Sequence, residues 1–223
     1  MRAVIDWSYG LLSEDEQQFF RALGSFAGVF TAEAAAFVAM DAAPTGTDSI
    51  DRLADLVAKS LVVADVSDAK PGFRLCDTTR AYALEKLDES GERERIARRH
   101  AEYYRNLFER AEAEAATRPT GNWLADYAPE IDNLRAALNW AFSPDGDVPI
   151  GVALTAAAVA LWMRLSLLGR VPRSRRGSAR HSRGRSEPGC ASRDEAPRRN
   201  GRIADLWWGF CQPRDRYGLH KGP

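Results

Sequence analysis

Side chains able to do chemistry are sparse in this sequence. It has 3 His and 3 Cys among 223 residues, and Cys76, Cys190 and Cys211 lack the spacing of a metal-ligand set. No Ser/His/Asp or Cys/His arrangement is evident. His100 falls on the apolar stripe of an amphipathic segment, where a buried structural role is expected. We therefore predict no catalytic site and no metal site, and the odd number of cysteines favours a reducing cytoplasm.

The residues that hold a nucleoside triphosphate are also missing. A phosphate-binding loop needs Gly-x-x-x-x-Gly-Lys followed by Ser or Thr, because its backbone N–H groups and its Lys surround the phosphates. The sequence contains no such stretch, and no apolar strand ends in the acidic residues that hold magnesium. The chain itself is therefore not expected to hydrolyse ATP, and no cofactor is predicted.

Basic residues on a predicted helix over residues 48–60 and on a predicted β-hairpin over residues 61–76 could contact DNA, because a helix can enter the major groove while a hairpin lies beside it. These residues are Arg52, Lys59, Lys70 and Arg74. The acidic residues on the same two elements are Asp48, Asp51, Asp55, Asp65 and Asp68. The predicted helix has a net charge of −1. Because a groove-reading surface must offset the charge of the phosphates, a protein partner is favoured over DNA, which stays as the alternative.

The helices that position these residues are marked by their caps. Ser13 to Glu16 is a capping box, in which each end residue bonds the backbone N–H of the other, so a first helix begins there. Thr31 caps a second helix that runs through Met40. A third helix covers residues 48–60, where apolar residues recur at helical spacing.

After the predicted third helix, the spacing of the apolar residues changes from helical to strand-like. Residues 61–66 and 73–76 are short and rich in β-branched or aromatic side chains, so they predict a hairpin around a turn at 67–72. Asp77 or Thr78 is expected to cap a further helix, which ends near Gly91. Three helices, a two-stranded β-wing and a following helix predict a winged helix over residues 1–90.

Residues 91–169 predict an incomplete helical-repeat unit of the tetratricopeptide type. Residues 92–116 are amphipathic, Asp132 is expected to cap a second helix, and residues 150–168 form an apolar third one. With no partner helix following, Leu154, Leu161, Trp162 and Leu165 are expected to be exposed. The apolar run at 148–163 is 16 residues long, shorter than the about 20 that a membrane span needs, so no membrane contact is predicted. The predicted fold class is mainly α.

The last 54 residues differ from the rest. Residues 1–169 carry 17 Lys and Arg against 26 Asp and Glu, whereas residues 170–223 carry 14 against 5. In this segment 30 residues are Arg, Gly, Ser or Pro, so it cannot bury enough apolar surface to offset its ordering entropy, and we predict disorder. A frameshift near codon 169 would explain the abrupt change. The other interpretation is a basic tail that binds nucleic acid or another polyanion by charge.

Five stretches in order resemble one family, the bacterial STAND-class ATPases of the transcriptional-regulator type, related to AP-ATPases and NB-ARC proteins. They are Ala3-Val4-Ile5-Asp6-Trp7-Ser8-Tyr9 with Leu11-Leu12-Ser13, Phe26-Ala27-Gly28-Val29-Phe30, Leu56-Val57-Ala58-Lys59-Ser60-Leu61-Val62, Arg74-Leu75 with Arg80-Ala81-Tyr82-Ala83-Leu84-Glu85-Lys86-Leu87, and Glu130-Ile131-Asp132-Asn133-Leu134-Arg135-Ala136-Ala137-Leu138. The resemblance covers about residues 1–168.

This resemblance implies a regulatory role. In the family a winged helix folds over a separate P-loop domain that binds ATP or ADP, and a helical-repeat domain senses a partner. Leu75-Cys76-Asp77 resembles the family's Met-His-Asp position, whose His approaches the nucleotide in some members, but Cys76 replaces the His here. Residue chemistry alone suggests that Cys76 is a small buried strand residue and Asp77 a helix cap.

Taken together, the sequence predicts a non-catalytic regulatory or protein-interaction piece of a STAND signalling ATPase involved in transcription. Its expected partner is the nucleotide-binding domain of such an ATPase or another protein. The alternative is a free-standing winged-helix regulator that binds DNA.

Overall fold

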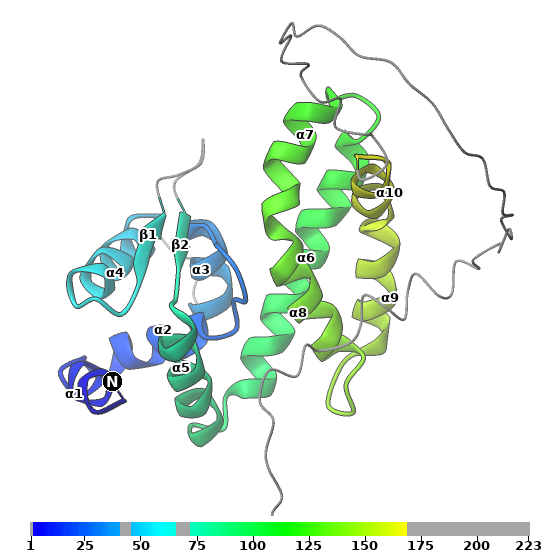
Figure 1. Ribbon diagram of the computed structural model, residues 1–223. Coiled ribbons are helices and arrows are strands. Elements are labelled where there is room, and N and C mark those ends of the chain that lie inside the picture. Colours follow the sequence, from blue (N-terminus) through cyan, green and yellow to red (C-terminus); the bar gives the residue numbers. More distant parts are fainter. Residues whose placement is uncertain (1, 41–45, 66–71, 169–223) are drawn as a thin grey trace, which may run out of the picture. The chain divides into compact units, whose positions relative to one another are not determined.

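The N-terminal elements of the computed structural model form a winged helix (Figure 1). The structure describes residues 2–40, 46–65 and 72–168. In this part a short helix, α1, precedes three helices, a two-stranded sheet and a following helix, as predicted. Their bounds are α1 Arg2–Gly10, α2 Glu14–Leu23, α3 Ala32–Ala39, α4 Gly46–Ala58, β1 Val63–Asp65, β2 Gly72–Arg74 and α5 Asp77–Glu89.

The predicted caps of α2 and α3 are present. Ser13 Oγ accepts from the Glu16 N–H at 3.3 Å, and the Ser13 N–H donates to Glu16 Oε2 at 2.8 Å, so the capping box is complete. Thr31 Oγ1 accepts from the Ala34 N–H at 3.1 Å. Each cap satisfies backbone donors that a helix N-terminus would otherwise leave without partners.

The core of the winged helix is apolar and densely filled. Phe19, Phe20 and Leu23 of α2 and Leu53 and Leu56 of α4 are buried. The loop between α2 and α3 adds two further aromatic rings, whose centroids are 4.4 Å apart, and these belong to Phe26 and Phe30. Stacked aromatic rings in this loop close the core at the point where the sheet begins.

The wing is an antiparallel pair, with Val63 opposite Arg74 and Asp65 opposite Gly72. A further bridge joins Phe30 to Phe73, so the loop before α3 lies along β2. The predicted second strand is shorter than expected, because it ends at Arg74 and Cys76 occupies the N-cap position of α5. The prediction that Asp77 or Thr78 caps this helix was therefore wrong.

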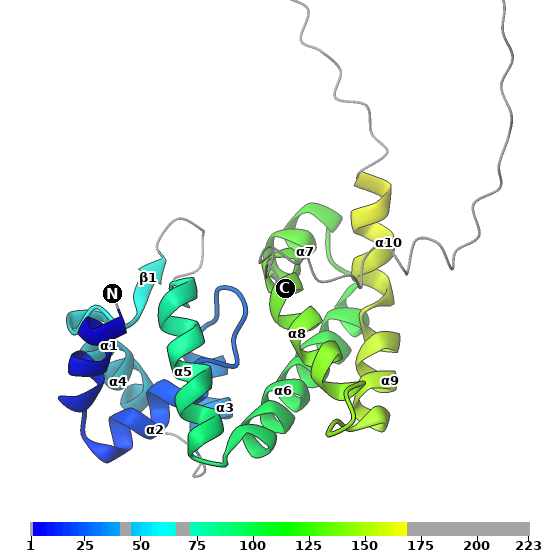
Figure 2. The same ribbon diagram turned by 60° about the horizontal axis from the view of Figure 1, so that its bottom comes forward.

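Helices continue after the winged helix (Figure 2). Their bounds are α6 Arg93–Glu114, α7 Thr120–Tyr127, a 3-10 turn η1 Ala128–Glu130, α8 Ile131–Ala141, α9 Val148–Ala157 and α10 Val159–Leu168. The long helix α6 packs against α3, α8 and α9, and α8 packs against α9. The described residues as far as Leu168 lie in one compact unit. Whether residues 1–90 and 91–169 act as separate domains stays a prediction.

Several sequence-based expectations for these helices were wrong. Asp132 lies inside α8 and does not cap it, because the helix begins at Ile131 directly after the 3-10 turn. Helix α7 was not predicted. The predicted helix over 150–168 is two helices, α9 and α10, that meet at Ala158 with a bend of 44°.

Burial also differs from expectation in the last two helices. Leu154, Leu161, Trp162 and Leu165 were expected to be exposed, yet Leu154 and Leu161 are fully buried, and Trp162 and Leu165 are partly buried against the core. The large exposed apolar side chains of α9 and α10 are Val148, Val152, Val159 and Met163. On α1, Trp7 is 69% exposed.

Within the described ranges, no single helix has both the length and the apolar composition to cross a membrane. Helices α9 and α10 meet both conditions only when taken together across their bend. The predicted disordered segment, residues 170–223, and its proposed origin in a frameshift lie outside the described residues.

Candidate functional site

Helix α4 occupies the position from which a winged helix commonly contacts its ligand. Its inner face buries Leu53 and Leu56, which fixes the orientation of the helix. The residues on its exposed face are Asp48, Ile50, Asp51, Ala54, Asp55 and Ala58. This face therefore carries three carboxylates and a short apolar ridge, but no exposed cation.

Arg52 on α4 and Lys59, directly after α4, both turn toward α2. Lys59 Nζ lies 2.5 Å from Glu16 Oε1. Arg52 donates to the Asp15 carbonyl oxygen at 3.2 Å, and its guanidinium lies 3.8 Å from the Asp15 carboxylate and 5.9 Å from the centre of the Phe19 ring. The hydrogen bond from Lys59, followed by that from the Ser13 backbone, lowers the pKa of Glu16. Two of the four candidate DNA contacts thus pair with α2, and each side chain is about one-third exposed.

The wing offers one described cation. Arg74 on β2 is about half exposed, and its Nε lies 3.8 Å from Asp65 Oδ2 on β1. Lys70, the other candidate on the wing, lies outside the described residues. Among the candidate contacts to DNA in the described ranges, Arg74 is the most accessible.

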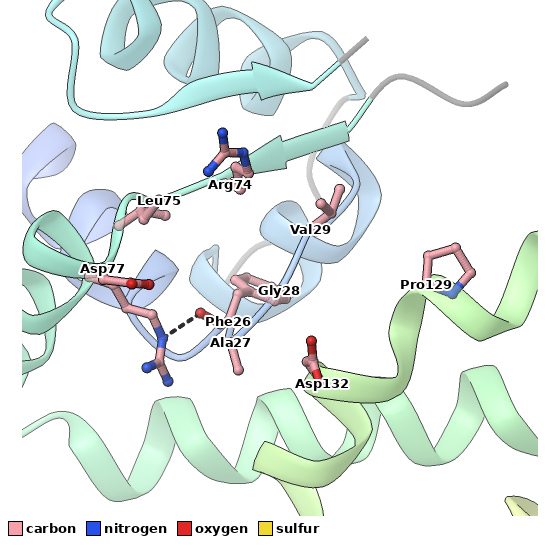
Figure 3. A pocket seen from close by; sticks show the side chains of 10 residues that line it. Phe26, Ala27, Gly28, Val29, Arg74, Leu75, Asp77, Pro129 and Asp132 are labelled. Carbon is pink, nitrogen blue, oxygen red and sulfur yellow. Dashed lines mark hydrogen bonds between the residues drawn. The ribbon is translucent and has the colours of Figure 1, made fainter. Parts of the chain in front are cut away.

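A hollow of about 380 Å³ lies between the α2–α3 loop, the start of α5 and the region around η1 (Figure 3). Its lining residues are Phe26, Ala27, Gly28, Val29, Arg74, Leu75, Asp77, Arg80, Pro129 and Asp132. Arg80 Nε donates to the Phe26 carbonyl oxygen at 2.7 Å. Burial lowers the pKa of Arg80, while the nearby Asp77 carboxylate opposes that shift. With two arginines and two aspartates, the lining is close to neutral.

The Cys76–Asp77 position is only partly as expected. Cys76 is exposed, not buried, and its side chain makes no capping hydrogen bond. It is absent from the lining of the hollow, whereas Asp77 is part of it. Of the two residues, only Asp77 lines the hollow.

His100 is a core residue, as expected. It is 3% exposed, and its ring lies 5.1 Å from that of Phe26 and 4.7 Å from that of Tyr104. Its Nε2 atom has no hydrogen-bond partner. Over the ranges that the structure describes, no three His, Cys, Asp or Glu side chains gather in a group that could hold a metal ion.

Sequence reasoning missed two important polar residues, Arg80 and Asn133. Both lie in stretches quoted for the family resemblance, but a sequence does not show what their side chains contact. Asn133 is fully buried on α8 and bonds the α2–α3 loop, more than 100 residues earlier in the chain. The available signal was a polar residue at a core position of an otherwise apolar helical pattern.

Comparisons with known proteins agree with the winged helix. Residues 12–88 match the family model described as a winged helix-turn-helix domain. A protein of Mycobacterium tuberculosis strain H37Rv, named as a proposed HTH-type transcriptional regulator, is 39% identical over 166 residues, which is 73% of this chain. A protein of Mycobacterium bovis with the same type of name matches equally well.

An uncharacterised protein of Mycobacterium tuberculosis is 38% identical over 102 residues, covering 45% of this chain and 26% of the relative. The chain spans only 18% of the length of the two named regulators. No solved structure matches the chain.

Proposed function

We propose that this chain is a non-catalytic winged-helix module in the regulation of transcription, and that α4 acts on a protein partner. The matched winged helix-turn-helix domain and the names of the mycobacterial relatives support the transcriptional role. The observation that supports a protein partner is the charge of the α4 face. Asp51 and Asp55 point outward, while Lys59 and Arg52 are drawn to α2.

Electrostatics favours this assignment. A helix that enters the major groove approaches a dense array of phosphates, so its exposed charges must be positive on balance. On α4 the exposed face is acidic, and freeing Lys59 for DNA would break its ion pair with Glu16. A basic protein surface, in contrast, would be attracted to the same carboxylates without rearrangement of α4.

Direct DNA binding is the second candidate, and the family match favours it. It would use Arg52, Lys59, Lys70 and Arg74, with the half-exposed Arg74 making the first contact. In a winged helix the wing commonly lies beside the nucleic acid while the third helix enters the groove.

Titration of the full chain into labelled duplex DNA at several salt concentrations separates the two candidates. Each phosphate contact contributes about one unit to the slope of log affinity against log salt. We expect Arg52→Gln and Arg74→Gln to leave affinity and slope unchanged, because any DNA contact would come from residues 170–223. A fall in affinity in either variant, with thermal stability retained, would replace the protein-contact proposal by the DNA-binding one.

The finer form of the proposal concerns the partner. A nucleotide-binding domain of the STAND class would hold ATP or ADP, while this chain would cover it through the wing and the face around Asp77, in addition to the α4 face. The resemblance at Leu75-Cys76-Asp77 and the position of Asp77 in the hollow support this partner. We further propose that residues 1–90 and 91–169 are two separate domains. We also propose that the protein is cytoplasmic.

Calorimetric titration with ADP and ATP tests where nucleotide is held. The chain alone is expected to give no heat of binding, and Asp77→Asn is expected to weaken its association with a STAND nucleotide-binding domain. Binding of nucleotide by the chain alone would contradict the assignment of nucleotide to a partner domain.

A further inference from the structure

The loop from Phe26 to Phe30 is the point at which the helices after the winged helix contact the region of the wing. Asn133 of α8 is fully buried against it. Its Oδ1 accepts from the N–H groups of Ala27 at 2.8 Å and Gly28 at 2.9 Å, and its Nδ2 donates to the Val29 carbonyl oxygen at 2.7 Å. One side chain therefore satisfies three backbone groups of the loop, two donors and one acceptor.

The orientation of Asn133 is itself fixed. Nδ2 also lies 3.3 Å from Glu130 Oε2, and the same carboxylate oxygen accepts from the Tyr104 hydroxyl at 3.1 Å. Because Oδ1 faces two donors and Nδ2 faces two acceptors, the opposite amide orientation would lose all four contacts. Tyr104 of α6 and Glu130 of the 3-10 turn η1 thus hold the Asn133 side chain in one orientation.

The far end of the same loop is part of the sheet. The Phe30 N–H donates to the Phe73 carbonyl oxygen, and the Phe73 N–H donates to the Phe30 carbonyl oxygen, both at 2.8 Å. Gly72 on β2 approaches the loop so closely that a Cβ there would lie 2.3 Å from Val29 Cγ1. Val29, bonded by Asn133, therefore also touches the wing strand directly.

We propose that residues 26–30 are a coupling segment, and that Asn133 is the positioning residue through which α8 sets the position of β2. Any displacement of α8 by a partner bound to the helices would have to break the three Asn133 bonds or carry the loop with it. Since Phe30 and Phe73 share two backbone hydrogen bonds, a moved loop moves the wing. This goes beyond the proposed function by giving a route along which the helices control the winged helix.

Amide hydrogen exchange of the full chain tests the coupling without any ligand. In Asn133→Ala, the Ala27 and Gly28 amides lose their acceptor, and the amides of Phe30 and Phe73 are expected to exchange at least tenfold faster. The control is Leu154→Ala on α9, which removes a fully buried apolar side chain and leaves the Asn133 hydrogen bonds in place. At equal global stability, adjusted with denaturant, the control is expected to leave the Phe73 amide protected.

Asn133→Leu provides a second variant if the alanine variant does not fold. Its side chain is similar in shape to that of Asn, so it removes the three bonds to the loop without leaving a cavity, and the same increase at Phe30 and Phe73 is expected. Unchanged exchange of the Phe73 amide in both variants, or the same increase in Leu154→Ala, would overturn the coupling. Neither result depends on whether the winged helix binds DNA or protein, so failure of this inference is distinguishable from failure of the proposed function.

Discussion

His100 is enclosed by aromatic rings and leaves one ring nitrogen, Nε2, without a hydrogen-bond partner. Burial, aided by the positive charge of Arg80, lowers the pKa of His100 to about 3 from 6.5. The neutral ring fits the core, whereas the imidazolium would be buried without a counter-charge. This residue therefore links stability of the core to pH.

The first prediction follows from the direction of that shift. Below pH 6.5 the unfolded chain binds a proton at this position that the folded chain does not, so stability falls as pH decreases toward 3. Between pH 8 and pH 5 His100 should cost about 2 kcal/mol of unfolding free energy. Urea unfolding at the two pH values should show a loss smaller by this amount in His100→Phe. Equal losses in both proteins would contradict the buried neutral state.

Two tryptophans give a matched comparison. The indole of Trp123 is fully buried, donates to the Ala111 carbonyl oxygen at 2.8 Å and lies 4.4 Å from the Arg164 guanidinium, whereas Trp7 is 69% exposed. We expect Trp123→Ala to lower the unfolding free energy by about 3–5 kcal/mol, and Trp7→Ala to change it by about 0.5 kcal/mol or less. Similar losses of unfolding free energy in the two variants, measured by chemical denaturation, would contradict the exposed position of Trp7.

At the scale of elements, the turn between α8 and α9 has steric requirements as strict as those of the helices that it joins. The link from α8 to α9 passes close to the end of α8, since the Gly146 N–H donates to the Ser143 carbonyl oxygen. A Cβ on Gly146 would lie 2.1 Å from the Trp140 carbonyl oxygen and 2.6 Å from that of Ala141. Both are backbone atoms, so they could not move without unwinding the last turn of α8.

Gly146→Ala is therefore expected to destabilise the chain by about 1–3 kcal/mol through this steric conflict. Gly121→Ala is the control, because nothing lies within 4 Å of a Cβ at that position of α7, and alanine there should stabilise by up to about 1 kcal/mol. Thermal unfolding of the two variants should shift in opposite directions. A stabilised Gly146→Ala would mean that the α8–α9 turn is open.

At the scale of the molecule, one cluster of buried apolar residues runs from α2 to α10. It includes Leu23 in the winged helix and Leu154 in α9, both fully buried. The hydrogen bonds of Asn133 cross the same region. We therefore expect the described part of the chain to unfold in one cooperative transition.

Leu23→Ala and Leu154→Ala test this cooperativity. Each removes a buried side chain and should lower the unfolding free energy by about 2–5 kcal/mol. In each variant the midpoint should fall equally whether unfolding is followed by tryptophan fluorescence or by far-ultraviolet circular dichroism. Two separate transitions, one sensitive to each substitution, would instead support independent units at residues 1–90 and 91–169.

Most of the fold could be predicted from local patterns in the sequence. The capping box at Ser13, the cap at Thr31 and the change to β-branched residues after α4 each act over a few residues, so the sequence alone could identify them. The break at Ala158 could not be predicted, since it lies in an alanine-rich run with no Pro or Gly.

The candidate site was harder to predict, because its contacts join distant residues. The acidic character of α4 is visible in the sequence, but the pairing of Lys59 with Glu16 depends on how α4 packs against α2. The partners of Asn133 in the α2–α3 loop lie 104 to 106 residues away. Long-range contacts of this kind are set by tertiary packing, for which a single sequence gives no spacing rule.

The outward side chains of α4 also bear on how this surface can evolve. Asp51 and Asp55 are exposed, so the packing that holds α4 in place does not depend on them. The sign of the charge on this face can therefore change by surface substitution while the scaffold keeps its stability. Surface substitutions alone could therefore convert an acidic protein-binding face into a basic nucleic-acid-binding face, or the reverse, while every intermediate sequence still folds.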